Sequence, residues 1–318
     1  MKVFVTGGSG FLGKELIKIL KDYDIPYINF DLKPSKDDAN YVKGDIRSID
    51  AIRNCIDDCN TIVHLAAEHR DDVNPISLYD EVNVNGTKNI CQVASEKGIN
   101  NIIFTSSVAV YGFAKIKCDE NGKIDYFNDY GRTKYAAEKA LNSWVNGQKD
   151  SKNLTIIRPT VIFGHGNRGN VYNLVNQIAS NKFLMIGGGK NQKSLAYVEN
   201  VAAFIHKILD NPILGNEVYN YVDTPDFNMN DLVALIRDTL KLKSNYNLKI
   251  PYPVGMFAGY LFDMVARMLN KKLSISSIRV KKFCMDTSFS SKKMQKIYNP
   301  PYKLKEALIK TIQSEFLN

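Results

Sequence analysis

The segment TGGSGFLG near the N-terminus constrains the fold of this chain more than any other short stretch. It places Gly7, Gly10 and Gly13 at three-residue intervals, between the apolar run KVFVT and the amphipathic stretch FLGKELIKILKD. Glycines here permit a tight turn and a close approach of the backbone, while the first helical N–H groups, at Phe11 and Leu12, and the helix dipole suit a pyrophosphate. The pattern predicts a strand–turn–helix unit that binds a dinucleotide.

Asp31 strengthens this interpretation because it ends the second apolar run, 24 residues after Gly7. A carboxylate at that point accepts hydrogen bonds from an adenosine ribose and repels a 2′-phosphate, which favours NAD. Lys33, two residues later, can offset the repulsion, so NADP is not excluded. The alternative is a glycine turn that merely caps a helix, followed by a surface Asp.

The rest of the chain alternates short apolar runs with longer segments of helical period as far as NLTIIRP, which predicts a parallel sheet covered on both faces. A chain of 318 residues with 44% hydrophobic content can bury one large core or two adjoining ones. We expect an α/β fold with a Rossmann-type, doubly wound parallel sheet and a smaller mixed C-terminal domain. The dinucleotide-binding domain should span 1–165, with 196–222 returning to it, and 166–318 should mainly bind substrate.

Composition excludes several classes of protein. No run of about 18 or more apolar residues is present, and the N-terminal apolar run is too short for a secretory signal, so we expect a cytoplasmic protein without an integral membrane segment. Five cysteines without metal-ligand spacing indicate neither a disulfide framework nor a metal site. The formal charge of +9 comes from scattered lysines and arginines rather than a basic tract with aromatics, which argues against nucleic-acid binding.

The segment VGMFAGYLFDMVARMLN, from Val254 to Asn270, is apolar enough to suggest a helix on a membrane surface. Asp263 and Arg267 interrupt it, so a packed helix of the substrate domain is the favoured interpretation.

Three Tyr-x-x-x-Lys pairs stand in the middle of the chain: Tyr111 with Lys115, Tyr130 with Lys134, and Tyr135 with Lys139. On a helix, residues four apart share a face, close enough for an ammonium to lower the pKa of a phenol and make it a base. With 17 tyrosines and 42 basic residues, some pairs arise by chance, so the spacing alone does not identify the one that acts.

Taken together, the motifs TGGSGFLG, NVNGT, FTSSVAVYG, YGRTK and RPTVIFG, with Asp31, resemble the extended short-chain dehydrogenase/reductase superfamily. The resemblance is to its NAD-dependent epimerase/dehydratase branch, which acts on nucleotide sugars, and it covers most of the chain. It implies Ser107, Tyr130 and Lys134 as the catalytic residues. Geometry agrees, because Ser107 ends a predicted sheet strand 23 residues before Tyr130, whereas Tyr135 is turned well away from that helix face. For Ser107, a hydroxyl that only caps a turn is the alternative.

The resemblance also implies roles for residues around this centre. Tyr130 takes a proton from a sugar hydroxyl as hydride passes to the nicotinamide, Lys134 lowers the pKa of Tyr130 and holds the nicotinamide ribose, and Ser107 binds the reacting oxygen. The expected cofactor-binding residues are Gly7, Gly10, Phe11, Leu12, Gly13, Asp31, Asp45, Ile46, Leu65, Ala66, Ala67, Asn83, Tyr130, Lys134 and Pro159. For Asn83, a buried side chain that satisfies a helix kink is the alternative.

The expected substrate is a nucleotide-diphosphate sugar bound by Ser107, Tyr111, Arg168, Asn170 and Arg279, and the family implies a homodimer.

No carboxylate follows the strand-end Thr105, which argues against a 4,6-dehydratase. C4 epimerisation remains the main expectation, with a one-way 4-ketoreductase as the alternative. A non-sugar alcohol such as a sterol, or a non-catalytic dinucleotide-binding regulator, are further alternatives.

Overall fold

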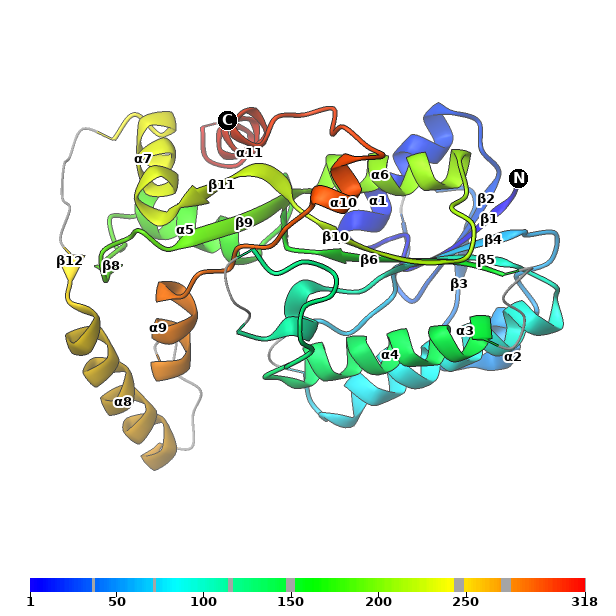
Figure 1. The fold of residues 1–318 in the computed structure, drawn as a ribbon, viewed down its shortest axis with the longest axis horizontal. Helices are drawn as coiled ribbons and strands as arrows, with labels where there is room; N and C mark the ends of the chain where they lie inside the picture. Colours follow the sequence, from blue (N-terminus) through cyan, green and yellow to red (C-terminus); the bar gives the residue numbers. More distant parts are fainter. Residues whose placement is uncertain are drawn as a thin grey trace.

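The structure is a computed structural model that describes residues 1–35, 38–70, 73–113, 117–146, 152–242, 249–269 and 276–317. It has the expected α/β architecture, with a central parallel sheet between two layers of helices and a smaller C-terminal part at one end (Figure 1). The strands of the central sheet follow the order β10-β6-β5-β4-β1-β2-β3. These strands are β1 (Val3–Thr6), β2 (Tyr27–Asp31), β3 (Tyr41–Lys43), β4 (Thr61–His64), β5 (Asn101–Thr105), β6 (Asn153–Pro159) and β10 (Asn216–Tyr221).

Two helical layers cover the sheet because its strands are apolar on both faces. Phe4 packs with Phe104 on one face, in the core between the sheet and the helices drawn below it in Figure 1. Val3 and Val5 point to the opposite face, as alternation along a strand requires. The lower layer contains α2 (Ile49–Arg53), α3 (Gly86–Glu96) and α4 (Asp129–Asn146), and the upper layer contains α1 (Phe11–Asp22) and α6 (Val198–Asp210).

The C-terminal part is built on a three-stranded sheet of order β11-β9-β7 and a two-stranded sheet, β12-β8. Its core is formed by side chains such as Phe163, Leu195, Leu232 and Leu308. The strands are β7 (Val161–Phe163), β8 (Met185–Ile186), β9 (Gln192–Tyr197), β11 (Asp223–Asn228) and β12 (Lys249–Ile250). The helices are α5 (Asn170–Ala179), α7 (Met229–Thr239), α8 (Tyr252–Met268), α9 (Ser277–Cys284), α10 (Lys292–Gln295) and α11 (Leu304–Phe316).

The chain crosses between the two parts more than once. After β7 and α5 it forms β9, returns through α6, which packs on α1, and adds β10 in parallel to β6 at the edge of the central sheet. The Rossmann-type fold class is therefore confirmed. No helix in the described parts of the chain is long and apolar enough to cross a membrane.

Candidate active site

The glycine loop leads from β1 into α1 at the carboxyl edge of the sheet, where parallel sheets of this kind bind ligands. Gly7 adopts a φ of +73°, and a Cβ on Gly13 would lie 2.3 Å from the carbonyl oxygen of Gly7. No side chain of the described residues caps α1, and its first turn carries no acidic residue. The N–H groups of Phe11 and Leu12 therefore remain available to an anion, and the loop fits a pyrophosphate.

Asp31 lies beside this loop at the end of β2. Its Oδ2 accepts a hydrogen bond from the backbone N–H of Ser9 (3.0 Å), and its Oδ1 accepts one from that of Lys33 (2.9 Å). The carboxylate is thus fixed at the edge of the loop, where the ribose of a dinucleotide would reach it. This arrangement fits NAD.

Other residues expected near the cofactor surround the same edge. The loop after β4 presses against the glycine turn, since a Cβ on Gly7 would lie 2.7 Å from the backbone nitrogen of Ala66. Burial alone would raise the pKa of Asp45, but hydrogen bonds from Arg47 (Nη2–Oδ2 2.6 Å) hold it below its usual range. Leu65 and Ala67 lie in the loop that contains Ala66, Ile46 is buried after Asp45, and Pro159 ends β6.

Ser107 and Tyr130 meet in the structure, as the sequence predicted for a catalytic pair. Ser107 begins the short 3₁₀ helix η2 (Val108–Tyr111), and its Oγ accepts a hydrogen bond from the backbone N–H of Ala109 (3.1 Å). Burial raises the pKa of Tyr130, while a hydrogen bond with the Ser107 side chain acts in the opposite direction. Ser107 therefore both caps the turn and contacts the phenol, so its two interpretations are compatible.

Lys134 lies one helical turn beyond Tyr130 on α4, with only 2% of its surface exposed. Its Nζ is 4.1 Å from the centroid of the Phe104 ring. Burial lowers the pKa of Lys134 to about 7, although the charge of Glu138 opposes the shift. The ammonium therefore changes charge near neutral pH, which suits a residue that works beside an acid–base group.

His64, at the end of β4, belongs to the segment HLAA, which was expected to line the cofactor, and its ring lies 5.4 Å from that of Phe104, the ring that Lys134 also contacts. Its Nδ1 lies 2.7 Å from the hydroxyl of Thr6, and its Nε2 lies 3.0 Å from that of Thr87. Because Thr87 donates its own hydrogen to the carbonyl of Asn83 (2.6 Å), it accepts from Nε2–H, and Thr6 donates to Nδ1. Burial and, secondarily, Lys134 lower the pKa of His64 to about 3, so the ring adds no second charge.

Asn83 joins the loop after β4 to the catalytic helix. It lies in a π-helical segment, η1 (Tyr79–Asn85), that continues into α3. Its Nδ2 donates to the carbonyl of Glu68 (2.9 Å) and to the hydroxyl of Thr133 (3.0 Å), and its Oδ1 accepts from the N–H of Glu68 (2.8 Å). The side chain thus orders the backbone of the loop after β4 and ties it to α4, and none of these three bonds goes to the backbone of η1 itself; cofactor binding by Asn83 stays a prediction.

A buried ion pair between Arg158 and Glu138 lies one helical turn beyond Lys134. Arg158 on β6 donates to both carboxylate oxygens of Glu138 on α4, at 2.9 and 2.6 Å. It also donates to the hydroxyl of Tyr111 (2.6 Å), which in turn donates to Asn220 (2.9 Å). Neither Arg158 nor Glu138 was predicted, although Glu138 follows Lys134 by four residues and so shares its helix face.

The residues expected to bind the substrate do not lie together at one place, in contrast to the catalytic residues. The Tyr111 ring is 1% exposed and its hydroxyl is engaged by Arg158 and Asn220, so the structure places it in the core rather than on an open wall. Arg168 pairs with Glu315 on α11 and lies 4.2 Å over the Tyr172 ring. Asn170 is exposed at the start of α5, Arg279 is exposed on α9, and Lys115 lies outside the described residues. Substrate binding by these residues stays a prediction.

Comparisons with known proteins agree with this geometry. The model of the NAD dependent epimerase/dehydratase family matches residues 3–221. The chain is 47% identical, over 99% of its length and 96% of the relative, to the N-acetyl-alpha-D-glucosaminyl-diphospho-ditrans,octacis-undecaprenol 4-epimerase of Escherichia coli O157:H7. It is 31% identical, over 98% of its length and 96% of the relative, to a decarboxylating sterol-4-alpha-carboxylate 3-dehydrogenase of Saccharomyces cerevisiae.

The fold is shared with solved structures of the same kind. The structure of MoeE5 in complex with UDP-glucuronic acid and NAD superimposes with a TM-score of 0.78, at 20% identity and with 98% of each chain covered. At this identity the likeness concerns the fold. With the family model covering more than half of the sequence and the relatives spanning nearly all of it, the chain belongs to the NAD dependent epimerase/dehydratase family, and it is an NAD-dependent enzyme of that family.

Proposed function

We propose that this enzyme inverts C4 of an N-acetylhexosamine that is joined through a diphosphate to a polyprenol. The observation that carries the reaction type is the Ser107–Tyr130 hydrogen bond, at the same sheet edge as the glycine loop, with Lys134 one turn away. The 47% identity to an epimerase whose name specifies a diphospho-undecaprenol substrate supports a polyprenol as the lipid that carries the sugar. Both relatives described above are named for lipid substrates, an undecaprenol and a sterol.

The residues of the chain account for the acid–base part of such a reaction. When bound, NAD supplies a hydride acceptor and then a hydride donor at the sugar carbon. Tyr130 as phenolate takes the proton of the C4 hydroxyl, and Ser107 holds that oxygen as it gains carbonyl character. In the return half, Tyr130 gives the proton back after the sugar presents its other face. Because the hydroxyl oxidised in the first half is formed again in the second, such a reaction would need no added oxidant or reductant.

Charge around Tyr130 decides whether this phenolate forms. Since burial raises the pKa of Tyr130, the side chain is a neutral phenol at pH 7 unless a positive charge stabilises its anion. We assign that task to protonated Lys134, whose own pKa of about 7 keeps both charge states accessible. This role of Lys134 agrees with the sequence expectation and remains a proposal.

The carrier differs from the nucleotide sugar expected from the sequence. A nucleotide-linked sugar presents the same diphosphate and the same C4 hydroxyl, so it is the second candidate substrate. The fold it shares with a UDP-sugar-binding structure keeps that candidate open. Homodimerisation, through the helices that carry Asn83 and Tyr130, and a cytoplasmic location also stay predictions.

The test offers the purified protein detergent-dispersed undecaprenyl-diphospho-N-acetylglucosamine and, in parallel, UDP-N-acetylglucosamine. The sugar released by mild acid is then identified by chromatography. We expect N-acetylgalactosamine from the lipid-linked substrate at a kcat/KM at least about tenfold higher than from the nucleotide sugar. A higher kcat/KM for the nucleotide sugar would mean that a nucleotide, not a polyprenol, carries the sugar. If neither substrate yields the 4-epimer, the proposed function is refuted.

Two tyrosine variants on one helix separate catalysis from folding. Tyr130→Phe removes the proposed acid–base group and should lower kcat by about 10³-fold or more. Tyr135→Phe is the matched control, because Tyr135 belongs to the neighbouring Tyr-x-x-x-Lys pair and its ring lies 4.8 Å from the Nζ of Lys139. Equal loss of activity in both variants would contradict the assignment of Tyr130.

A further inference from the structure

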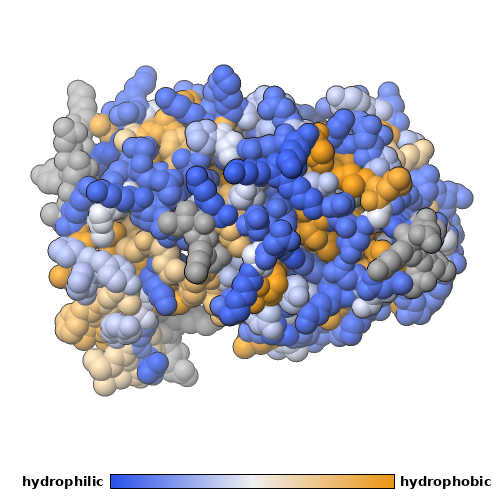
Figure 2. Space-filling model, viewed as in Figure 1, coloured by the Kyte–Doolittle hydropathy of each residue, from blue (hydrophilic) through white to orange (hydrophobic). Residues whose placement is uncertain are grey.

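Helix α8 (Tyr252–Met268) carries large apolar side chains on its exposed surface, which is unusual for a helix of a globular domain. Phe257 is 64% exposed and Met268 is 77% exposed. The helix stands apart from the body of the molecule, and Figure 2 shows hydrophobic residues gathered over it at one end. The exposed apolar residues of α8 and its C-cap are Tyr252, Val254, Phe257, Tyr260, Leu261, Phe262, Met264, Val265, Met268 and Leu269.

The inner face of α8 is lined by small residues and is already occupied. A Cβ on Gly259 would lie 2.8 Å from the Cα of Ser277 at the start of α9, and one on Gly255 would lie 2.5 Å from Ile186. Asp263 points the same way and accepts a hydrogen bond from the N–H of Ser277 (3.2 Å). Residues 255, 259 and 263 are four apart, so the large apolar side chains occupy the remaining, outward arc.

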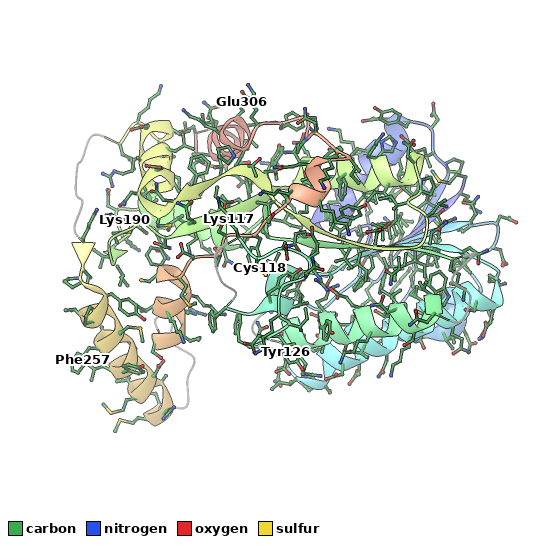
Figure 3. The ribbon with its side chains drawn as sticks, viewed as in Figure 1. Lys117, Cys118, Tyr126, Lys190, Phe257 and Glu306 are labelled. Carbon is green, nitrogen blue, oxygen red and sulfur yellow. The ribbon has the colours of Figure 1, made fainter. Side chains whose placement is uncertain are left out.

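The sequence favoured a packed helix over a membrane-surface helix for Val254 to Asn270, and in the described residues α8 does pack on α9, but only through its small residues, while its large apolar side chains stay exposed. Asp263, one of the two charged residues that interrupt this apolar segment, is turned towards α9. Phe257 lies on the outer side of α8, away from α9 (Figure 3). The acidic residue thus caps a neighbouring helix, and the apolar residues face outward.

The charge around this helix suits an anionic surface. Between residues 249 and 286 the sequence contains seven basic residues and two acidic ones. Of the acidic pair, Asp263 is turned towards α9, and Asp286 accepts a hydrogen bond from the backbone N–H of Gln192 (2.6 Å). An exposed apolar arc flanked by an excess of lysine and arginine over acidic residues is typical of helices that lie in the interface of an anionic bilayer.

The same helix pair is joined to the catalytic site. From α9, Lys282 Nζ lies 4.5 Å over the ring of Phe127, and Lys281 Nζ lies 5.0 Å over that of Phe113. The two rings stack on each other at 4.6 Å. Phe127 precedes Tyr130 by three residues, so a surface that holds α8 and α9 lies close to the approach to the catalytic tyrosine.

We propose that α8, with the basic residues of α9, docks the enzyme on the surface of an anionic lipid bilayer. The helix would lie in the interface rather than span the bilayer, and at 17 residues it is about 25 Å long. This inference rests on the proposed function, because a polyprenol-linked sugar is held in a membrane and its diphosphate lies at the headgroup level. Docking there brings the sugar to Tyr130 without extracting the lipid.

The test is flotation of the full-length protein with vesicles, in the absence of any sugar substrate. Vesicles of phosphatidylethanolamine and phosphatidylglycerol (3:1) are compared with vesicles of phosphatidylcholine alone, at low and high salt. We expect the protein to float with the anionic vesicles, less at high salt and much less with phosphatidylcholine. Phe257→Gln/Met268→Gln should lower the partition coefficient by about tenfold or more, because two large apolar side chains leave the interface.

Leu214→Gln is the control variant, since Leu214 is 82% exposed in the loop before β10, far along the chain from α8. It should float like the unmodified protein, and unchanged melting and NAD binding should show that all variants fold. Absence of flotation, or equal flotation of the double variant, would overturn the docking proposal. So would loss of a dimer, rather than of vesicle binding, in the double variant. Turnover of detergent-dispersed substrate by a protein that does not float would refute docking and leave the proposed function standing.

Discussion

Replacing Lys134 by Met should make the protein more stable at neutral pH, although it should abolish turnover. Lys134 is buried, and its pKa falls from 10.5 to about 7 on folding. A shift of one pKa unit corresponds to about 1.4 kcal/mol, so at pH 7 the buried amine costs the folded state about 4 kcal/mol relative to an uncharged side chain. Loss of the contact with Phe104, worth about 1 kcal/mol, leaves an expected gain of about 3 kcal/mol for Lys134→Met.

The pH dependence of this gain in stability shows whether it comes from removing the buried amine or from better packing of the Met side chain. Below pH 7 both the folded and the unfolded chain hold the proton, so the full cost of Lys134 is present. As the pH rises from 7 towards 10.5, only the unfolded chain keeps the proton, and the cost shrinks by about 1.4 kcal/mol per unit. The advantage of the Met variant should therefore fall by about 2 kcal/mol between pH 7 and pH 9.

Urea unfolding of the cofactor-free proteins at pH 7 and pH 9 measures both quantities. Lys139→Met is the matched control, because Lys139 is exposed on the same helix, and its effect should stay within about 0.5 kcal/mol at both pH values. A Met variant less stable than the unmodified protein at pH 7, or a difference that does not change with pH, would refute the reasoning.

Three further substitutions test other parts of the site. Gly13→Ala places a methyl group 2.3 Å from the carbonyl oxygen of Gly7 and should weaken NAD binding by about tenfold or more in a titration, whereas Gly188→Ala, with open space around it, should not. Asp31→Ser removes the carboxylate that repels a 2′-phosphate, so the ratio of the NADP and NAD dissociation constants should fall by about tenfold, and an unchanged ratio would argue against the role of Asp31. Glu138→Gln leaves Arg158 buried without its partner and should lower the free energy of unfolding by about 3–5 kcal/mol, in contrast to Glu306→Gln on the surface of α11 (Figure 3).

The parts of the site that could be predicted depend only on residues that are close together in the sequence. The glycine spacing, the strand-end Asp31 and the four-residue step from Tyr130 to Lys134 are each set by one turn or one helix, so the sequence shows them directly. Ser107 could be paired with Tyr130 because a tyrosine base needs a hydroxyl partner across the substrate, and Ser107 follows a strand at the edge of the sheet where the cofactor binds. The family resemblance, now confirmed by the family model, selected Tyr130 among three similar pairs.

The parts that escaped prediction depend on contacts between distant segments. The ion pair of Arg168 with Glu315 joins residues that are 147 positions apart in the sequence, so it could not be predicted, while substrate binding by Arg168 stays a prediction. The orientation of α8 could not be read from its composition, because the contact of Asp263 with Ser277 decides which face turns inward. The Arg158–Glu138 pair is buried between α4 and the sheet, and the burial of a polar residue can be recognised only once the helices and strands are packed together.

The central claim is that Tyr130 drives a redox-neutral inversion at C4 of a diphosphate-linked sugar. The most direct measurement follows conversion of undecaprenyl-diphospho-N-acetylglucosamine by the purified enzyme without any added reductant, and identifies the nucleotide released when the enzyme is denatured. We predict an equilibrium mixture of the two C4 epimers over many turnovers, no net reduction of cofactor, and no conversion by Tyr130→Phe. Conversion that requires stoichiometric NADH or NADPH would contradict the account and indicate a one-way ketoreductase.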